Sequence, residues 1–250
     1  MVSIILIVLF ISLLRLRGAI QEVSLHSDVN EGRKLDKKRM KGRHITDSLQ
    51  ESGARVVEGA ISSFRPGGHY ICLTFDEGAK PLFVTKIMTI LKEKKIHATF
   101  FLEMHSINNG KNMITESIQN GHEIAILGPP DNKTLLAEKL SLFKTNKHHM
   151  LTRPHHEYSN ENIADYTKIT KDMKVILWSL DAKDKDIIDA KEIAKRVIKL
   201  AAPGDVILMR NDIFPQTVDA LPIIIDGLTR KGYEFLTISE ILSFPDDSPH

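Results

Sequence analysis

Charged side chains follow several short apolar runs of this sequence, at the places where strands would end. They are Asp76, Glu77, Arg153, Asp181 and Arg210. Carboxylates can take up a proton or bind a cation, and arginines hold carboxylates by charge-assisted hydrogen bonds. Because functional groups in a parallel barrel collect at the C-terminal ends of the strands, these side chains are the first candidates for a site.

Strand-like and helix-like segments alternate from about Arg55 onward. Apolar runs of strand length occupy 70–75, 95–103, 122–127, 148–154, 174–181 and 204–210, and helical spacing occupies 81–95, 111–120, 133–146, 160–172, 188–201 and 215–231. The runs are apolar throughout, which is typical of parallel strands covered on both faces. These repeats predict an α/β barrel or an open doubly wound sheet. No glycine-rich phosphate loop follows the first strand, which argues against a nucleotide-binding sheet.

The N-terminal part differs in composition from the rest. The first fourteen residues carry no charged side chain and are too short to span a bilayer comfortably, so they favour a signal peptide. We expect a signal peptide over 1–19, with an uncleaved anchor as the alternative, a polar and basic linker over 20–53, and one domain over 54–245. The protein would then be secreted, extracellular or in the cell wall, or membrane-anchored at the cell surface.

Charge and cysteine content exclude some other classes. The net charge of +2 gives no case for a nucleic-acid partner. Cys72 is the only cysteine, so no intrachain disulfide is possible, and its apolar surroundings predict a buried thiol. We also expect Glu103 to be solvated at a strand end and His122 to be a structural residue at a strand start.

The strand ends carry motifs that resemble the polysaccharide deacetylases, the family of chitin and peptidoglycan deacetylases. The matching segments, in the family's order, are LTFDEG (73–78), KIHATFFLE (95–103), NGHEIAIL (120–127), LTRPHH (151–156), VILWSLDAKD (175–184), GDVILMRND (204–212) and GYEFLTISEIL (232–242). The resemblance covers residues 70 to 242. It implies the family's fold, a distorted (β/α) barrel.

The resemblance also implies a chemistry, the removal of an acetyl group from an N-acetylated sugar. In the family, a divalent metal such as zinc or cobalt is held by one Asp and two His, and it polarises the acetamide. A carboxylate acts as the base and a His as the general acid. Asp76 falls on the base position and Arg153 on the Arg that orients the base. Trp178, Asp181 and Leu208 match residues that shape the acetyl pocket and support the site.

The remaining positions depart from the family pattern. Glu77 replaces the metal-binding Asp, and Leu127 and Asp131 fall on the two ligand His. Leu127 cannot bind a metal, so we expect no cofactor in this chain. Arg210 replaces the general acid and cannot give up a proton near neutral pH. It could instead pair with Asp76, Glu77 or Asp131 as a fixed cation.

We therefore expect a deacetylase-like protein of the cell wall or surface, catalytically inactive, that still binds chitin or a related N-acetylated polysaccharide. The alternatives are an active metal-dependent deacetylase with altered ligands, and a structural or protein-binding scaffold. Trp178 and Tyr158 could stack on sugar rings. The pairs His148–His149 and His155–His156 could supply ligands to a different metal site. Asn132 begins a glycosylation sequon in the predicted metal loop.

Overall fold

The structure is a computed structural model, and it describes residues 55–76, 81–103, 106, 111–128, 150–155, 163–170, 173–210 and 215–244. All of these lie in the second of two compact units, Ile45–His250. The predicted signal peptide, the linker and the helix at 133–146 lie outside the described residues. Within the described ranges, no helix is both long enough and apolar enough to cross a membrane.

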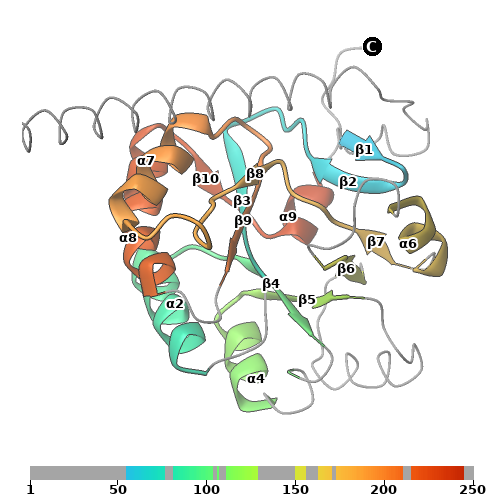
Figure 1. The fold of residues 1–250 in the computed structure, drawn as a ribbon, viewed down its shortest axis with the longest axis horizontal. Coiled ribbons are helices and arrows are strands. Elements are labelled where there is room, and N and C mark those ends of the chain that lie inside the picture. The colour runs from blue at the N-terminus through green and yellow to red at the C-terminus, as the bar shows by residue number, and fades with distance from the viewer. Residues whose placement is uncertain are drawn as a thin grey trace, which may run out of the picture. The chain divides into compact units, whose positions relative to one another are not determined.

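A parallel sheet forms the centre of this unit (Figure 1). Its strands follow the spatial order β7-β6-β5-β4-β3-β9-β8, and β10 pairs with the start of β3. In chain order the strands are β3 (Tyr70–Asp76), β4 (Thr99–Glu103), β5 (Glu123–Leu127), β6 (Leu151–Arg153), β7 (Lys174–Val175), β8 (Leu180–Asp181), β9 (Val206–Arg210) and β10 (Glu234–Phe235). The helices are α2 (Pro81–Lys94), α4 (Lys111–Gln119), α6 (Ile163–Ile169), α7 (Ala190–Leu200), α8 (Pro215–Arg230) and α9 (Ile238–Leu242).

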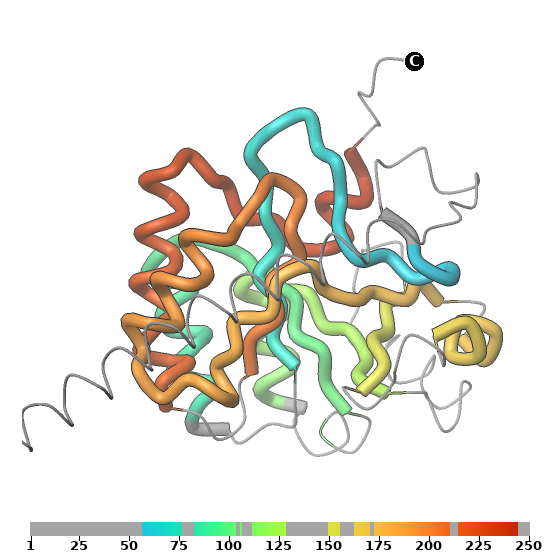
Figure 2. Tube along the Cα trace, turned by 45° about the horizontal axis from the view of Figure 1, so that its top comes forward, coloured from blue at the N-terminus to red at the C-terminus, as the bar shows by residue number. Residues whose placement is uncertain are grey.

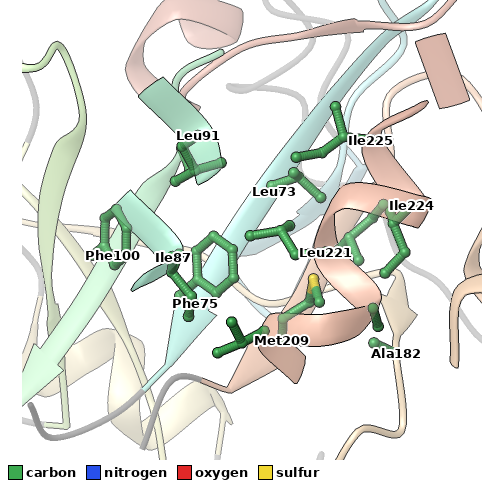
Figure 3. Packing of buried hydrophobic residues seen from close by; sticks show 14 of the residues in the cluster. Leu73, Phe75, Ile87, Leu91, Phe100, Ala182, Met209, Leu221, Ile224 and Ile225 are labelled. Atoms are coloured by element: carbon green, nitrogen blue, oxygen red, sulfur yellow. The ribbon is translucent and has the colours of Figure 1, made fainter. Parts of the chain in front are cut away.

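Both faces of this sheet are buried, as the apolar strands predict. Alternate residues of a strand point to opposite faces, so Leu73 and Phe75 of β3 face outward and pack with side chains of α2 and α8 (Figure 3). Cys72 lies in a separate inner cluster with side chains of β5, β6, β9 and α9. Thr74 and Asp76 share the parity of Cys72, and they too face the barrel interior.

The N-terminal end of the barrel interior is closed by α9. Thr99, the first residue of β4, accepts a hydrogen bond from the backbone N–H of Ile238. Glu123, the first residue of β5, accepts one from Ser239 N–H and another from the Thr99 hydroxyl. Cys72 is buried there, as predicted, and burial raises the pKa of its thiol well above the ordinary value. Polar groups at the strand starts therefore hold the helix that blocks this end.

The predicted single strand over 174–181 is wrong, because it is broken into β7 and β8. Between these strands the chain runs beside an N-terminal hairpin of β1 (Arg55–Val57) and β2 (Ala60–Ser63), as Figure 2 shows in blue beside orange. Ile61 bridges Ile176, and Leu177 N–H donates to Ile61 O at 2.7 Å. The hairpin thus supplies backbone partners at the break in the sheet, which a strand would otherwise supply.

The strand predicted over 95–103 is also shorter than expected, since β4 begins at Thr99. Lys95 adopts a left-handed conformation (φ 56°) and ends α2. Its N–H donates to Lys92 O, and Ile96 N–H donates to Leu91 O. These bonds satisfy the last carbonyls of the helix, so the lysine and isoleucine that extend the apolar run belong to a helix cap.

Candidate functional site at the C-terminal end of the barrel

The Arg153 guanidinium crosses the barrel interior from β6 to β3. Nη1 donates to Asp76 Oδ1 at 2.6 Å and to the Thr74 hydroxyl at 2.9 Å. Nε donates to Ile176 O and Nη2 to Leu177 O, each at 3.0 Å. The side chains of Arg153 and Asp76 are 0% and 1% exposed. One arginine therefore ties β3 and β6 to the segment that follows β7.

Aromatic rings line this ion pair. The Arg153 guanidinium carbon lies 3.9 Å from the centre of the Phe101 ring and 5.7 Å from that of Trp178, which is half-buried. Burial lowers the pKa of Arg153, and the neighbouring Asp76 carboxylate raises it. The ordinary pKa of a guanidinium is high enough that Arg153 stays charged near neutral pH. The pair predicted between the base position and its arginine is thus formed.

Arg210, at the end of β9, is held by a carboxylate that the sequence analysis missed. Asp184 is fully buried and accepts hydrogen bonds from Arg210 N–H at 2.7 Å and from Arg210 Nη1 at 3.1 Å. The Thr217 hydroxyl donates to the same carboxylate at 2.8 Å. Burial raises the pKa of Asp184, while Arg210 and Thr217 act in the opposite direction. The spacing Asp181-x-x-Asp184 within the VILWSLDAKD segment was the signal available in the sequence.

Asp181 lies beside this cluster. Its Oδ1 accepts a hydrogen bond from Lys183 N–H at 2.7 Å and lies 3.8 Å from Arg210 Nη1. The ion pairs of Arg210 with described residues are thus to Asp184 and Asp181, whereas Asp76 pairs with Arg153. Asp76 and Arg210 are nevertheless register partners on β3 and β9. Both residues therefore lie at one rim, but the cation that pairs with Asp76 is Arg153, from β6.

A row of side chains continues this rim over β4, β5 and β6. Glu103, Leu127 and Arg153 are register partners on these strands. Leu127 is buried and offers no donor atom at its predicted ligand position. Glu103, predicted to be solvated, is partly so, because its side chain is 28% exposed and its Oε1 lies 4.0 Å from His155 Nδ1.

Two further predictions concern buried residues. Leu208 is fully buried on β9 beside Thr74, its register partner on β3. His122 is 4% exposed and packs edge-on against the rings of His97 and Phe100, so its predicted structural place is confirmed. Several candidates lie outside the described residues, namely Glu77, Asp131, Asn132, His148, His149, His156 and Tyr158. Among the side chains that are described, no three of His, Cys, Asp or Glu converge as metal ligands.

Comparison with known proteins agrees with the fold and the motifs. Residues 65–177 match the family model described as polysaccharide deacetylase. A peptidoglycan-N-acetylglucosamine deacetylase of Bacillus cereus is 29% identical over 190 residues, which are 70% of this chain and 88% of the relative. A peptidoglycan-N-acetylmuramic acid deacetylase of Bacillus subtilis is 28% identical over 193 residues, 70% of this chain. This chain covers only 39% of that second protein's length.

Solved structures share the architecture. A peptidoglycan N-acetylglucosamine deacetylase aligns with a TM-score of 0.61 and 26% identity, over 72% of this chain and 91% of that one. A pseudoenzyme of the CE4 family from Bacillus anthracis aligns with a TM-score of 0.60 and 20% identity, over 75% and 70% of the two chains. The half-barrel of parallel strands with its helices is therefore the distorted (β/α) barrel that the resemblance implied.

The expectation of no cofactor is contradicted by these relatives. The deacetylases of the family are metal-dependent. The solved peptidoglycan N-acetylglucosamine deacetylase contains 4-naphthalen-1-yl-N-oxidanyl-benzamide, a hydroxamic acid of the kind that chelates divalent metals. A divalent metal ion is thus the cofactor that the family implies. In this chain Leu127 does not fit a metal-ligand position, and the other two positions, Glu77 and Asp131, lie outside the described residues.

Proposed function

We propose that this chain, which matches the polysaccharide deacetylase family over residues 65–177, binds an N-acetylated polysaccharide without deacetylating it. The proposal keeps the family's ligand class and departs from the family's reaction. The binding site is the C-terminal rim of the barrel, where Asp76, Arg153, Trp178 and Asp181 lie.

The single observation that carries the loss of activity is Arg210. Amide hydrolysis needs a proton for the leaving amine, and a general acid that supplies it contributes about 10²–10⁴ in rate. A guanidinium keeps its proton near neutral pH. Arg210 is also bound to Asp184 through both its backbone N–H and its side chain, so it is fixed in place.

Leu127 gives independent support. The resemblance assigns this position to a metal-binding imidazole, and a buried isobutyl group has no lone pair to offer. Losing a ligand lowers the affinity of the site for any metal ion. It thereby also weakens the polarisation of the acetamide, which supplies several kcal/mol of transition-state stabilisation. Two separate steps of the family's reaction are thus impaired by two substitutions on different strands, β5 and β9.

The rest of the rim supports continued binding. The Asp76–Arg153 pair is intact and buried, and it fixes the floor of the site. Trp178 is half-buried, which leaves part of its indole available to stack on a sugar ring. Two of the relatives above are named for peptidoglycan N-acetylglucosamine, a sugar that is also the unit of chitin. We therefore propose a polymer of N-acetylglucosamine as the ligand, in peptidoglycan or chitin.

Acetate release and binding are the decisive measurements. We expect no acetate from N-acetylglucosamine oligomers or peptidoglycan in the presence of zinc or cobalt, together with binding of the same ligands by calorimetry. Turnover that is abolished by Asp76→Ala would show instead an active deacetylase with altered ligands. Absence of binding to chitin, chitosan and peptidoglycan would favour instead a structural or protein-binding scaffold.

A reinstatement variant tests why activity is absent. A solved structure of the related pseudoenzyme is described as a mutant with restored enzymatic activity. In this chain, the change that returns the four departing positions to the family pattern is the combination of Glu77→Asp, Leu127→His, Asp131→His and Arg210→His. Zinc-dependent acetate release from this variant, and none from the same variant with Asp76→Ala added, is the expected result.

The N-terminal sequence supports a proposal for the place of action. We propose that the protein works outside the cell, because the uncharged start of the chain suits a signal peptide. N-terminal sequencing of the mature protein should begin after Gly18 or Ala19, whereas an intact N-terminus in the membrane fraction would show an anchor. Glycosidase treatment should shift the mobility of the protein but not that of Asn132→Gln, if the sequon is used.

A further inference from the structure

We propose that His155 and Glu103 form a hydroxyl-binding subsite for the saccharide at the C-terminal rim. The inference rests on the proposed carbohydrate-binding function and adds the residues that would hold one sugar unit. Neither residue belongs to the positions that the resemblance assigns to the base, the metal ligands, the acid or the acetyl pocket.

The two side chains meet across the end of β5. Glu103 is the last residue of β4, and His155 lies two residues beyond the end of β6. Leu127, the last residue of β5, is the register partner of Glu103. His155 is 39% and Glu103 28% exposed, so both are partly ordered by packing and remain accessible to a ligand.

The imidazole of His155 packs against the backbone of Gly128. It has φ of +86°, and a Cβ added to it would lie 2.4 Å from His155 Nε2. Its N–H donates to Arg153 O at 2.8 Å, and its carbonyl accepts from the Thr152 hydroxyl at 3.2 Å. The backbone under the ring is therefore fixed to β6, and the positive φ of Gly128 favours glycine, whose missing Cβ lets the ring lie this close.

The spacing between the two groups suits a hydroxyl. His155 Nδ1 and Glu103 Oε1 are 4.0 Å apart, which is too long for a direct hydrogen bond. A hydroxyl oxygen placed between the two groups could form hydrogen bonds of about 2.7 Å to the carboxylate and about 2.9 Å to the imidazole. The angle between these two bonds at the oxygen would be about 90°. A sugar hydroxyl can donate to the carboxylate while it accepts from the imidazole N–H, and it needs only a small rotation of either side chain.

An aromatic face lies near the same rim. Arg153, the register partner of Leu127, has its guanidinium beside the half-buried Trp178. A carboxylate and an imidazole for the hydroxyls, with an indole for the apolar face of a ring, match the two kinds of surface on a pyranose. The chemistry of the pair thus points to a neutral sugar.

The opposite end of the barrel offers a matched control. His97 Nδ1 lies 3.8 Å from Glu240 Oε1, and these side chains are 47% and 34% exposed. A Cβ added to Gly121, with φ of +84°, would lie 2.6 Å from His97 Nε2. This second pair is again a histidine and a glutamate, with the imidazole packed against a glycine of positive φ. It lies just before β5, whereas the proposed subsite lies just after it. The control pair lies away from the C-terminal rim, and Glu240 Oε2 in addition accepts a hydrogen bond from Thr237 N–H at the start of α9.

The test is calorimetric titration of the full protein with N-acetylglucosamine tetramer. His155→Ala and Glu103→Gln should each weaken affinity about five- to tenfold, the range expected for one or two lost hydrogen bonds. His97→Ala and Glu240→Gln should leave affinity unchanged. Glu103→Gln keeps the side-chain shape, so it remains informative if His155→Ala does not fold.

Two outcomes separate the inference from the function on which it rests. If the unaltered protein binds and both rim variants bind as tightly, the subsite is wrong and the proposed function stands. If the unaltered protein binds neither this tetramer nor peptidoglycan fragments, the proposed function itself fails. Equal weakening by the rim variants and by the His97 and Glu240 variants would also overturn the subsite, because it would show a general effect of losing such a pair.

Discussion

Arg153 contributes to the site mainly through the partners that it holds together. It bonds a carboxylate, a hydroxyl and two backbone carbonyls, and it is fully buried. A buried ion pair is costly to break, because the remaining partner keeps an uncompensated charge in a medium of low dielectric constant. This pair therefore has a structural role whether or not the family's reaction survives.

Removal of the charge of Arg153 should expose this role. We expect Arg153→Met to lower the free energy of unfolding by about 3–5 kcal/mol, because it leaves Asp76 buried without its cation. Urea denaturation followed by circular dichroism measures the loss. Adding Asp76→Asn to that variant should recover part of the stability, since the unpaired carboxylate is then gone. Equal stability of the single and the double variant would refute the explanation.

At the scale of elements, the turn before β9 is packed tightly against the chain that follows β2. Phe64 N–H donates to Gly204 O at 2.9 Å. A Cβ added to Gly204, with φ of +82°, would lie 2.1 Å from Phe64 O. The contact is between two backbones, so neither can move aside as a flexible side chain would. The glycine thus sets the distance between the hairpin connection and β9, the strand that carries Arg210.

A pair of glycine variants can measure this contact. Gly204→Ala should destabilise the protein by at least about 2 kcal/mol more than Gly232→Ala. Gly232 has the same φ of +82°, but a Cβ there would meet its nearest atom only at 4.0 Å. The strain of a positive φ is common to both, so their difference reports the backbone clash. Thermal or urea unfolding that gives equal losses would contradict the close approach.

At the scale of the whole barrel, the N-terminal hairpin lies at the gap between β7 and β8, where the parallel strands do not close the barrel. The path of paired strands runs from β7 to β8 without a direct pairing between those two. Ile61 lies in the inner cluster, is 1% exposed and bridges Ile176 between them. Ser63 bridges Asp205, just before β9. The hairpin is therefore part of the barrel and not an appendage to it.

The contribution of the hairpin can be tested with two isoleucines. Ile61→Ala should lower the free energy of unfolding by about 2–5 kcal/mol, the usual range for a buried large-to-small change. Ile188→Ala, at a residue that is 86% exposed, should change it by less than about 0.5 kcal/mol. Hydrogen exchange at Leu177, whose N–H donates to Ile61 O, should accelerate in the first variant only. Unaltered exchange there would separate the hairpin from barrel closure.

Residue types and local order determine much of this protein without reference to its coordinates. Runs such as YICLTF are apolar on both faces, so they predict buried parallel strands, and β3 to β6 and β9 form where such runs occur. The motif order predicts the distorted barrel, and the placement of Asp76, Arg153 and Asp181 at one rim follows from the parallel direction of the strands. Local periodicity and strand direction encode these features.

Only the tertiary structure decides which of these charged residues pair. Arg210 is the register neighbour of Asp76, yet it bonds Asp184, and Asp76 is held by an arginine 77 positions away. The break between β7 and β8 and the meeting of His155 with Glu103 over Gly128 likewise depend on contacts between distant segments. The physical reason is that a buried charge must be paired at good hydrogen-bond geometry. That geometry depends on how distant segments pack in three dimensions, and spacing along the chain does not determine it.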